Sequence, residues 1–133
     1  RTMMEEPVRT VLNIAQHALM GEIAVRGNRL AEAEQHFRAA MKLEDGMIYI
    51  EPPDWHYPIR HSLGLVLLKQ GKAAAAERTY LEDLRRFPEN GWSLYGLAAS
   101  LRAQGKNAEA ARVDARFRKS WSNADLKLTA SRF

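Results

Sequence analysis

The chain repeats part of its own sequence at an interval of 34 residues. Five positions match at this interval. In order, Leu63, Gly64, Leu67, Gly71 and Ala76 correspond to Leu97, Ala98, Leu101, Gly105 and Ala110. A chain with such a period folds as a stack of similar units, because each unit covers the apolar face of its neighbour. This feature limits the fold more than any single motif does.

A third copy lies upstream at a longer interval. Met20, Gly21, Ala24 and Ala33 match residues that follow 43 positions later. The nine extra residues fall between Gly46 and His56, so we predict one inserted loop at about 46–56. The sequence therefore predicts a single domain over 1–133, with repeats at about 14–47, 57–90 and 91–124.

The residue spacing within each copy predicts helices. Apolar residues three and four positions apart, such as Leu63, Leu67 and Leu68, form one stripe on a helix. Gly71 and Gly105, with Asn28 in the same register, stand where the left-handed backbone of a helix end is needed. We expect an all-α fold with helices at about 8–26, 30–44, 57–70, 73–87, 91–104 and 107–120, and a short helix near 123–130.

The small residues of the repeat predict close helix crossings. Gly21, Gly64 and Ala98 are expected to face Ala33, Ala76 and Ala110 of the helix that follows, so that the two helices of a hairpin approach each other closely. Aromatic residues, Phe37 and Tyr80, occupy the next position of the second helices, and Pro88 ends one of them.

As a set, these residues resemble the tetratricopeptide-repeat (TPR) family over about residues 14–121, and the tail resembles the C-terminal portion of longer bacterial TPR proteins. The resemblance implies an α-solenoid of three helix-turn-helix repeats with a C-terminal capping segment. It also implies a scaffold that binds proteins rather than an enzyme. The first helix is longer than one repeat needs, which suggests that it continues an upstream array or caps it.

Three acidic residues depart from the family pattern. Asp45 replaces the terminal proline of the first repeat, Asp83 a small apolar residue, and Asp114 an aromatic residue. A buried carboxylate without a donor is costly. We therefore predict that Asp83 points inward and is paired, with Ser93, Trp92 or a backbone amide as the nearest donors.

The resemblance also implies a binding groove lined by the first helix of each repeat. Its register gives these residues: Glu22, Arg26, His61, Leu65, Lys69, Trp92, Tyr95 and Arg102. We expect Trp92 and Tyr95 to anchor a peptide or protein surface and the basic residues to meet its carboxylates. Packing of Trp92 against a neighbouring helix is the alternative. The exposed ends of a solenoid also allow self-association.

Composition excludes several other classes of function. The net charge is +4, but its 20 basic and 16 acidic residues are mixed along the predicted helices, which is typical of solvated faces and not of nucleic-acid binding. No apolar run approaches the roughly 20 residues of a membrane span. The absence of cysteine excludes disulfides and zinc-thiolate sites but leaves the compartment of this soluble protein open between cytoplasm and periplasm.

The remaining chemical hypothesis concerns the inserted loop. Glu51, Asp54, His56 and His61 could hold a divalent metal, but the two histidines are five residues apart and do not share a helical face. We therefore expect no metal and no cofactor. His17 and His36 are interpreted as ordinary, partly buried helix residues. The alternative function is an accessory or regulatory domain of a larger enzyme.

The loop itself carries much apolar surface. We expect it to be ordered, with Tyr49 or Trp55 packed near the edge of the groove. Two roles stay open at this point: a structural wedge, or part of the ligand site.

Overall fold

A computed structural model describes residues 5–47, 59–88 and 90–122, and these form six helices and no strand. The helices are α1 (Glu5–Arg26), α2 (Leu30–Met47), α3 (Ile59–Lys69), α4 (Ala73–Arg86), α5 (Gly91–Ala103) and α6 (Asn107–Ser122). The all-α class is confirmed, and each predicted helix end lies within three residues of the observed one. The expected helix near 123–130 and most of the inserted loop lie outside the described residues.

The same hydrogen-bonded turn closes three of the helices. Asn28, Gly71 and Gly105 have positive φ angles of 59°, 80° and 78°. After α3, the Gly71 amide donates to the Leu68 carbonyl at 2.9 Å and the Lys72 amide donates to the Leu67 carbonyl at 2.8 Å. This pattern caps the free carbonyls of a helix end, and glycine adopts the required backbone without a Cβ clash. The predicted left-handed turn residues are therefore confirmed.

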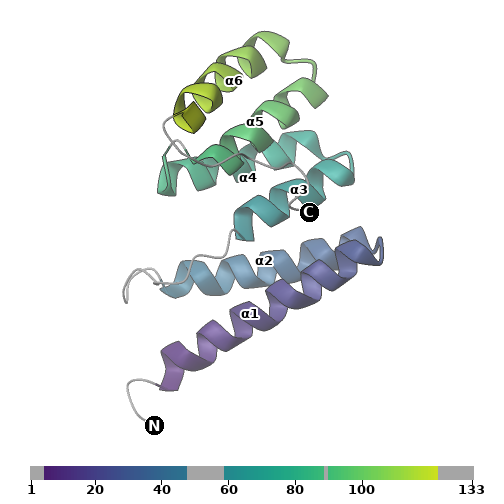
Figure 1. Cartoon of the computed structure of the whole chain (residues 1–133). Coiled ribbons are helices and arrows are strands. Elements are labelled where there is room, and N and C mark those ends of the chain that lie inside the picture. The colour runs from purple at the N-terminus through teal and green to yellow at the C-terminus, as the bar shows by residue number, and fades with distance from the viewer. Residues whose placement is uncertain (1–4, 48–58, 89, 123–133) are drawn as a thin grey trace. The chain divides into compact units, whose positions relative to one another are not determined.

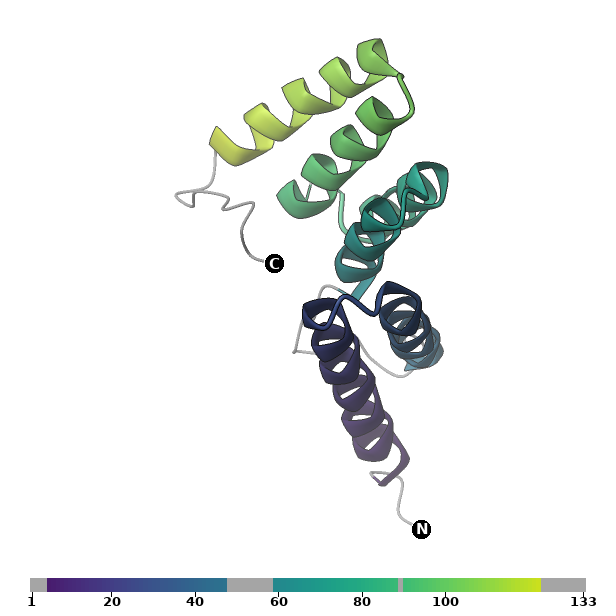
Figure 2. The ribbon, with the colours of Figure 1, turned by 90° about the vertical axis from the view of Figure 1, so that its right-hand side faces the viewer.

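The chain forms two compact units, residues 1–66 and 67–133, and the boundary falls inside α3. In the first unit α1 and α2 lie antiparallel and in contact (Figures 1 and 2). A core cluster joins these helices to the start of α3: Ile14, Ala40, Met47 and Ile59, flanked by Val11, Met41 and Leu43. Ala33 is also fully buried. Gly21 lies against the Phe37 ring, where a Cβ would come within 2.7 Å, so the close helix crossing at Gly21 is made with an aromatic residue.

In the second unit α5 contacts both α4 and α6. Its buried side chains come from all three helices: Tyr80, Leu94, Leu97, Ala98, Leu101, Ala110 and Val113. Gly96 lies flat against the buried Tyr80 ring, and a Cβ at that position would overlap it. Burial raises the pKa of the Tyr80 hydroxyl, and the nearby Asp83 carboxylate adds to the effect.

The inward acidic residue of α4 is paired as predicted. Asp83 is buried, and its Oδ2 accepts a hydrogen bond from Ser93 Oγ at 2.5 Å. A second donor, which we did not predict, is Asn90 Nδ2 at 2.9 Å. Asn90 also caps α5, because its Oδ1 accepts from the Ser93 amide at 3.1 Å. The carboxylate therefore fixes the start of α5 against α4.

The other two acidic departures also meet partners. Asp45 receives two hydrogen bonds from Arg60 Nη2, at 2.9 and 2.8 Å, and the Arg60 side chain is only 5% exposed. These two residues stand on either side of the inserted loop, so the ion pair ties its ends together. Asp114 accepts from Arg102 Nη1 at 2.7 Å, in a pair that is partly exposed on both sides.

Candidate binding surfaces

The outward side of α1 carries an unusual amount of exposed apolar surface. Its large apolar side chains and their exposed fractions are Val8 53%, Leu12 64%, Leu19 62%, Met20 40% and Ile23 51%. Four of them, Val8, Leu12, Leu19 and Ile23, follow one another at intervals of four, seven and four residues and so share one face of the helix. We call these four residues the outer stripe of α1.

The opposite side of α1 is also apolar. Ile14, Ala18 and Ala24 are buried there, and Gly21 meets Phe37 of α2. With 3.6 residues per turn, these residues lie on the far side of the helix from the outer stripe. A helix that packs on one side normally turns a polar face to water, whereas a helix that is apolar all round is normally covered on both sides.

Positive charge flanks the outer stripe. Arg9 and Arg26 are exposed near its two ends. Glu22 is the only acidic residue of α1 among the side chains that the structure describes, and it is half-buried. Among the side chains that the structure describes, the surface is therefore apolar along its length, with one exposed arginine near each end.

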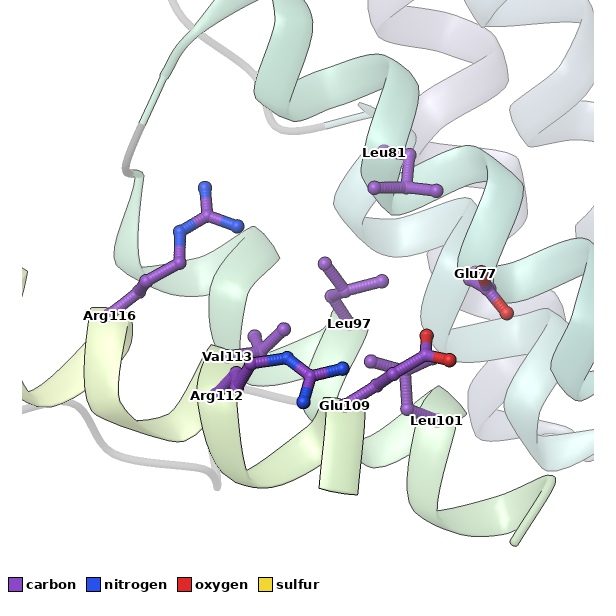
Figure 3. A pocket seen from close by; sticks show the side chains of 8 residues that line it. All are labelled: Glu77, Leu81, Leu97, Leu101, Glu109, Arg112, Val113 and Arg116. Atoms are coloured by element: carbon purple, nitrogen blue, oxygen red, sulfur yellow. The ribbon is translucent and has the colours of Figure 1, made fainter. Parts of the chain in front are cut away.

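A second candidate surface is a shallow groove of about 390 Å³ between α4, α5 and α6. Figure 3 shows Leu97 and Leu101 from α5 between Leu81 of α4 and Val113 of α6, with charged side chains around them. Most of this apolar floor is covered, because Leu97, Leu101 and Val113 are buried and only Leu81 is substantially exposed, at 41%. The groove thus offers one large apolar side chain, against five on α1.

One charged residue at the rim of the groove is already engaged within the unit. Glu77 Oε1 accepts hydrogen bonds from Gln104 Nε2 at 2.8 Å and from Lys106 Nζ at 3.3 Å. The hydrogen bond from Gln104, followed by that from Lys106, lowers the pKa of the Glu77 carboxyl below its ordinary value. The Gln104-Gly105-Lys106 segment therefore ties the turn between α5 and α6 to α4.

The predicted groove residues are divided between the two units. Glu22, Arg26, His61 and Leu65 belong to the first, and Lys69, Trp92, Tyr95 and Arg102 to the second. Arg26, Lys69, Tyr95 and Arg102 are exposed, whereas Glu22, Leu65 and Trp92 are half-buried. His61 is only 5% exposed, so the expectation that its side chain is open to a ligand is not met.

Two of the exposed groove residues have partners in their own unit. The Tyr95 ring packs against the Phe117 ring, with centroids 5.9 Å apart and planes tilted by 60°. Arg102, expected to meet a carboxylate of the ligand, meets Asp114 instead. Arg102 lies on α5 and Asp114 on the next helix, α6. The ion pair forms because Asp114 stands where the repeat pattern expects an aromatic residue.

A histidine pair that sequence reasoning did not connect joins α1 to α2. His17 Nδ1 lies 3.1 Å from His36 Nδ1, and the ring centroids are 5.4 Å apart. Both rings are half-buried. The sequence signal is weak, because the pairing depends on how two helices align across a turn and not on a pattern within either helix.

Several other expectations fall on residues outside the described part of the chain. The structure does not describe residues 48–58, which include Tyr49, Glu51, Asp54, Trp55 and His56. Within the described ranges, no group of three or more histidine, cysteine or acidic side chains is placed to hold a metal ion. None of the described helices combines the length and the apolar character that crossing a membrane requires.

Comparisons with family models, with curated proteins and with solved structures give no match.

Proposed function

We propose that this protein is a helical protein-binding module and that the outer stripe of α1 is a contact surface for a helix of another protein. The observation that carries the proposal is the exposure of Val8, Leu12, Leu19 and Ile23 on the side of α1 that faces away from α2. Contiguous apolar surface of this kind is unfavourable in water and marks interaction sites. A binding role, and not a catalytic one, is part of the proposal.

The shape and charge of the surface indicate the chemistry of the partner. A straight row of aliphatic side chains packs best against the ridges of another helix, which presents its own apolar residues at intervals of three and four. Arg9 and Arg26 at the two ends favour acidic residues beside that apolar face. An antiparallel second copy would instead bring Arg9 of one chain near Arg26 of the other, so like charges disfavour self-association in that arrangement.

The wider architecture that we propose is a TPR-like solenoid with a concave groove for a peptide or protein surface. It is supported by the 34-residue period and by the equivalent turns at Asn28, Gly71 and Gly105. In such an array Lys69 and Tyr95 of the second unit would contribute to a second contact surface. The outer stripe of α1 ranks first because, in the described ranges, it exposes more large apolar side chains than any other helix.

A synthetic helical probe tests the proposal. The probe is a fluorescein-labelled peptide of about 18 residues with leucines spaced like the outer stripe and glutamates at both ends. Fluorescence anisotropy should show saturable binding to the full chain. The Leu12→Ser/Leu19→Ser variant should bind at least about tenfold more weakly, because burial of each leucine contributes about 1.5–3 kcal/mol.

Two controls make the result specific. Leu81→Ser removes an exposed leucine of the second unit and should leave the affinity unchanged. A probe with lysines in place of the glutamates should bind more weakly than the acidic one. Equal affinity of wild type and the double variant would overturn the proposal. Sedimentation equilibrium that shows a wild-type dimer, lost in the double variant, would replace the foreign helix with a second copy of this chain.

A further inference from the structure

The outer stripe of α1 is interrupted at its centre. Leu12 and Leu19 are seven residues apart, whereas the other neighbours in the stripe are four residues apart. Ala15 and Gln16 lie between these leucines on the same side of the helix, and both are exposed. The stripe therefore carries large aliphatic side chains on either side of a place where no large apolar side chain stands.

The residues around this place have the spacing of a socket for a side chain of a facing helix. With 3.6 residues per turn, the i+3 and i+4 positions lie on opposite sides of the line that joins residue i to residue i+7. Where two helices interlock, each inserted side chain enters the space between four such residues. We call this space the central socket of α1; its four residues are Leu12, Ala15, Gln16 and Leu19.

Ala15 makes the central socket the roomiest part of the stripe. An alanine side chain ends at Cβ, so it leaves space over the helix that a leucine would fill. The next space along the stripe is narrower, because three of its four residues are large, apolar and exposed: Gln16, Leu19, Met20 and Ile23. Well-packed helices alternate large and small side chains across the contact, so the largest side chain of a partner belongs at Ala15.

The central socket is open to a partner. Leu12 and Leu19, which close its two ends, are 64% and 62% exposed, so no other element of the described ranges covers it. Arg9 precedes the socket and Arg26 follows it, and both are exposed. A partner that fills the socket therefore meets positive charge on either side of its central contact.

We propose that the partner helix of α1 inserts a large apolar side chain, such as leucine, methionine or phenylalanine, over Ala15 and carries acidic residues that meet Arg9 and Arg26. This inference rests on the proposed function and adds the residue that selects among helices. A helix with a small side chain at this place leaves the socket empty and loses contacts with its walls. Ala15 is therefore the specificity-determining residue of the surface.

The socket also favours a foreign helix over a second copy of this chain. An antiparallel second copy with the two stripes aligned would bring Ala15 of one chain near Gln16 of the other. Neither chain would then supply a large apolar side chain to the other chain's socket. The empty space adds to the repulsion between Arg9 and Arg26 in that arrangement.

Two helical probes that differ in the size of their central residues test the inference. Both follow the design of the acidic helical probe. In the middle of the widest interval between its leucines, the large-centre probe has two further leucines and the small-centre probe has two alanines. The intervals of the outer stripe read the same in both directions, so either orientation of the probe brings these residues to the socket. By fluorescence anisotropy, wild type should bind the large-centre probe at least about fivefold more tightly.

Filling the socket from the protein side should reverse this preference. Ala15→Leu occupies the space that the probe's leucine would enter, so it should weaken binding of the large-centre probe at least about fivefold and leave the small-centre probe bound as well as before or better. Because Ala15 is exposed, the unfolding temperature of the free protein should stay nearly the same. Ala115→Leu is the matched control: it makes the same change at an exposed alanine of α6 and should alter neither affinity.

The outcomes distinguish this inference from the proposed function. Equal affinity of wild type for the two probes would overturn the socket while leaving the outer stripe as the contact surface. An equal loss of both affinities in Ala15→Leu would also overturn it, because Ala15 would then be a contact without size selection. If wild type bound neither probe, the proposed function itself would fail, and this inference with it.

Discussion

Helix α1 packs one side against α2 and helix α6 packs one side against α5, but the other sides of α1 and α6 differ in chemistry. Among the α6 side chains that the structure describes, residues 107–120, the exposed long side chains are charged: Glu109, Arg112, Arg116, Arg118 and Lys119. On α1 they include Val8, Leu12, Leu19, Met20 and Ile23. In helical repeat proteins, a helix whose outer side faces water carries polar residues there, whereas a helix covered on both sides does not.

Both units pack a glycine of one helix against an aromatic ring of another helix. Gly21 against Phe37 in the first unit and Gly96 against Tyr80 in the second both bring two helices close together over an aromatic ring. Close packing over an aromatic ring therefore occurs in both units, between α1 and α2 in the first and between α4 and α5 in the second, and the contrast between α1 and α6 lies on their outer sides. We infer that α6 is built to face water and α1 is built to face another helix.

The largest expected change in stability comes from breaking an ion pair, and its size should differ between the two units. Asp45→Ala in the first unit should lower the free energy of unfolding by about 2–4 kcal/mol. The reason is that it removes both hydrogen bonds to Asp45 from Arg60, whose side chain is 5% exposed. The 45% exposure of Asp45 and the remaining Glu44 carboxylate, 3.6 Å from Arg60 Nη1, moderate the loss. Asp114→Ala breaks an exposed pair and should change the free energy by less than about 0.5 kcal/mol. Urea unfolding of both variants measures this difference, and equal losses would refute the assignment of Arg60 as the more buried partner.

The second expected effect tests the shared packing. Gly96→Ala and Gly21→Ala should each lower the free energy of unfolding by about 1–3 kcal/mol, because the new methyl group meets a buried ring. Gly46→Ala is the matched control, since a Cβ there contacts nothing within 4 Å inside α2. It should stabilise by about 0.5–1 kcal/mol. Destabilisation in the control as large as in the other two would show that backbone flexibility, and not the aromatic contact, explains the glycines.

A third prediction compares the turn residues. The first unit uses Asn28 and the second uses Gly105 in the same left-handed conformation. Gly105→Ala should cost about 1 kcal/mol, whereas Asn28→Gly should stabilise by a few tenths of a kcal/mol, because glycine adopts this conformation most easily. Thermal unfolding of the two variants should shift in opposite directions, and a shift of both in the same direction would contradict the equivalence of the turns.

Much of the fold was predictable because its signals are local. Gly71 and Gly105 indicate helix ends, because few other residues adopt the left-handed backbone conformation needed there. Asp83 indicates a hydrogen-bond donor nearby, because a buried carboxylate needs one. The His17–His36 contact was not predictable, because the two residues are 19 positions apart and their contact depends on how α1 and α2 align. The outer stripe of α1 was present as a spacing in the sequence, but only the position of α2 shows which side of α1 is exposed.

The smallest expected effect is a pH dependence in the second unit. Hydrogen bonds from Gln104 and Lys106 lower the pKa of Glu77 in the folded protein below its ordinary value of 4.5. The stabilisation is therefore fully present above about pH 4.5 and is lost as the pH falls through the folded value. Glu77→Gln should flatten the decline of stability below pH 4.5, measured as the free energy of unfolding against pH. An unchanged slope would show that the carboxylate gains nothing from its donors.

The central claim is that the outer side of α1 serves contact and not the fold. The most direct test is urea unfolding of wild type and of Leu12→Ser/Leu19→Ser, each with and without the acidic helical probe. Without the probe, the two proteins should agree within about 0.5 kcal/mol, because both leucines are more than half exposed. With the probe in excess, only wild type should gain stability, by about 2.7 kcal/mol at one hundred times its dissociation constant. A double variant that is strongly destabilised without the probe, or stabilised by it as much as wild type, would contradict the account.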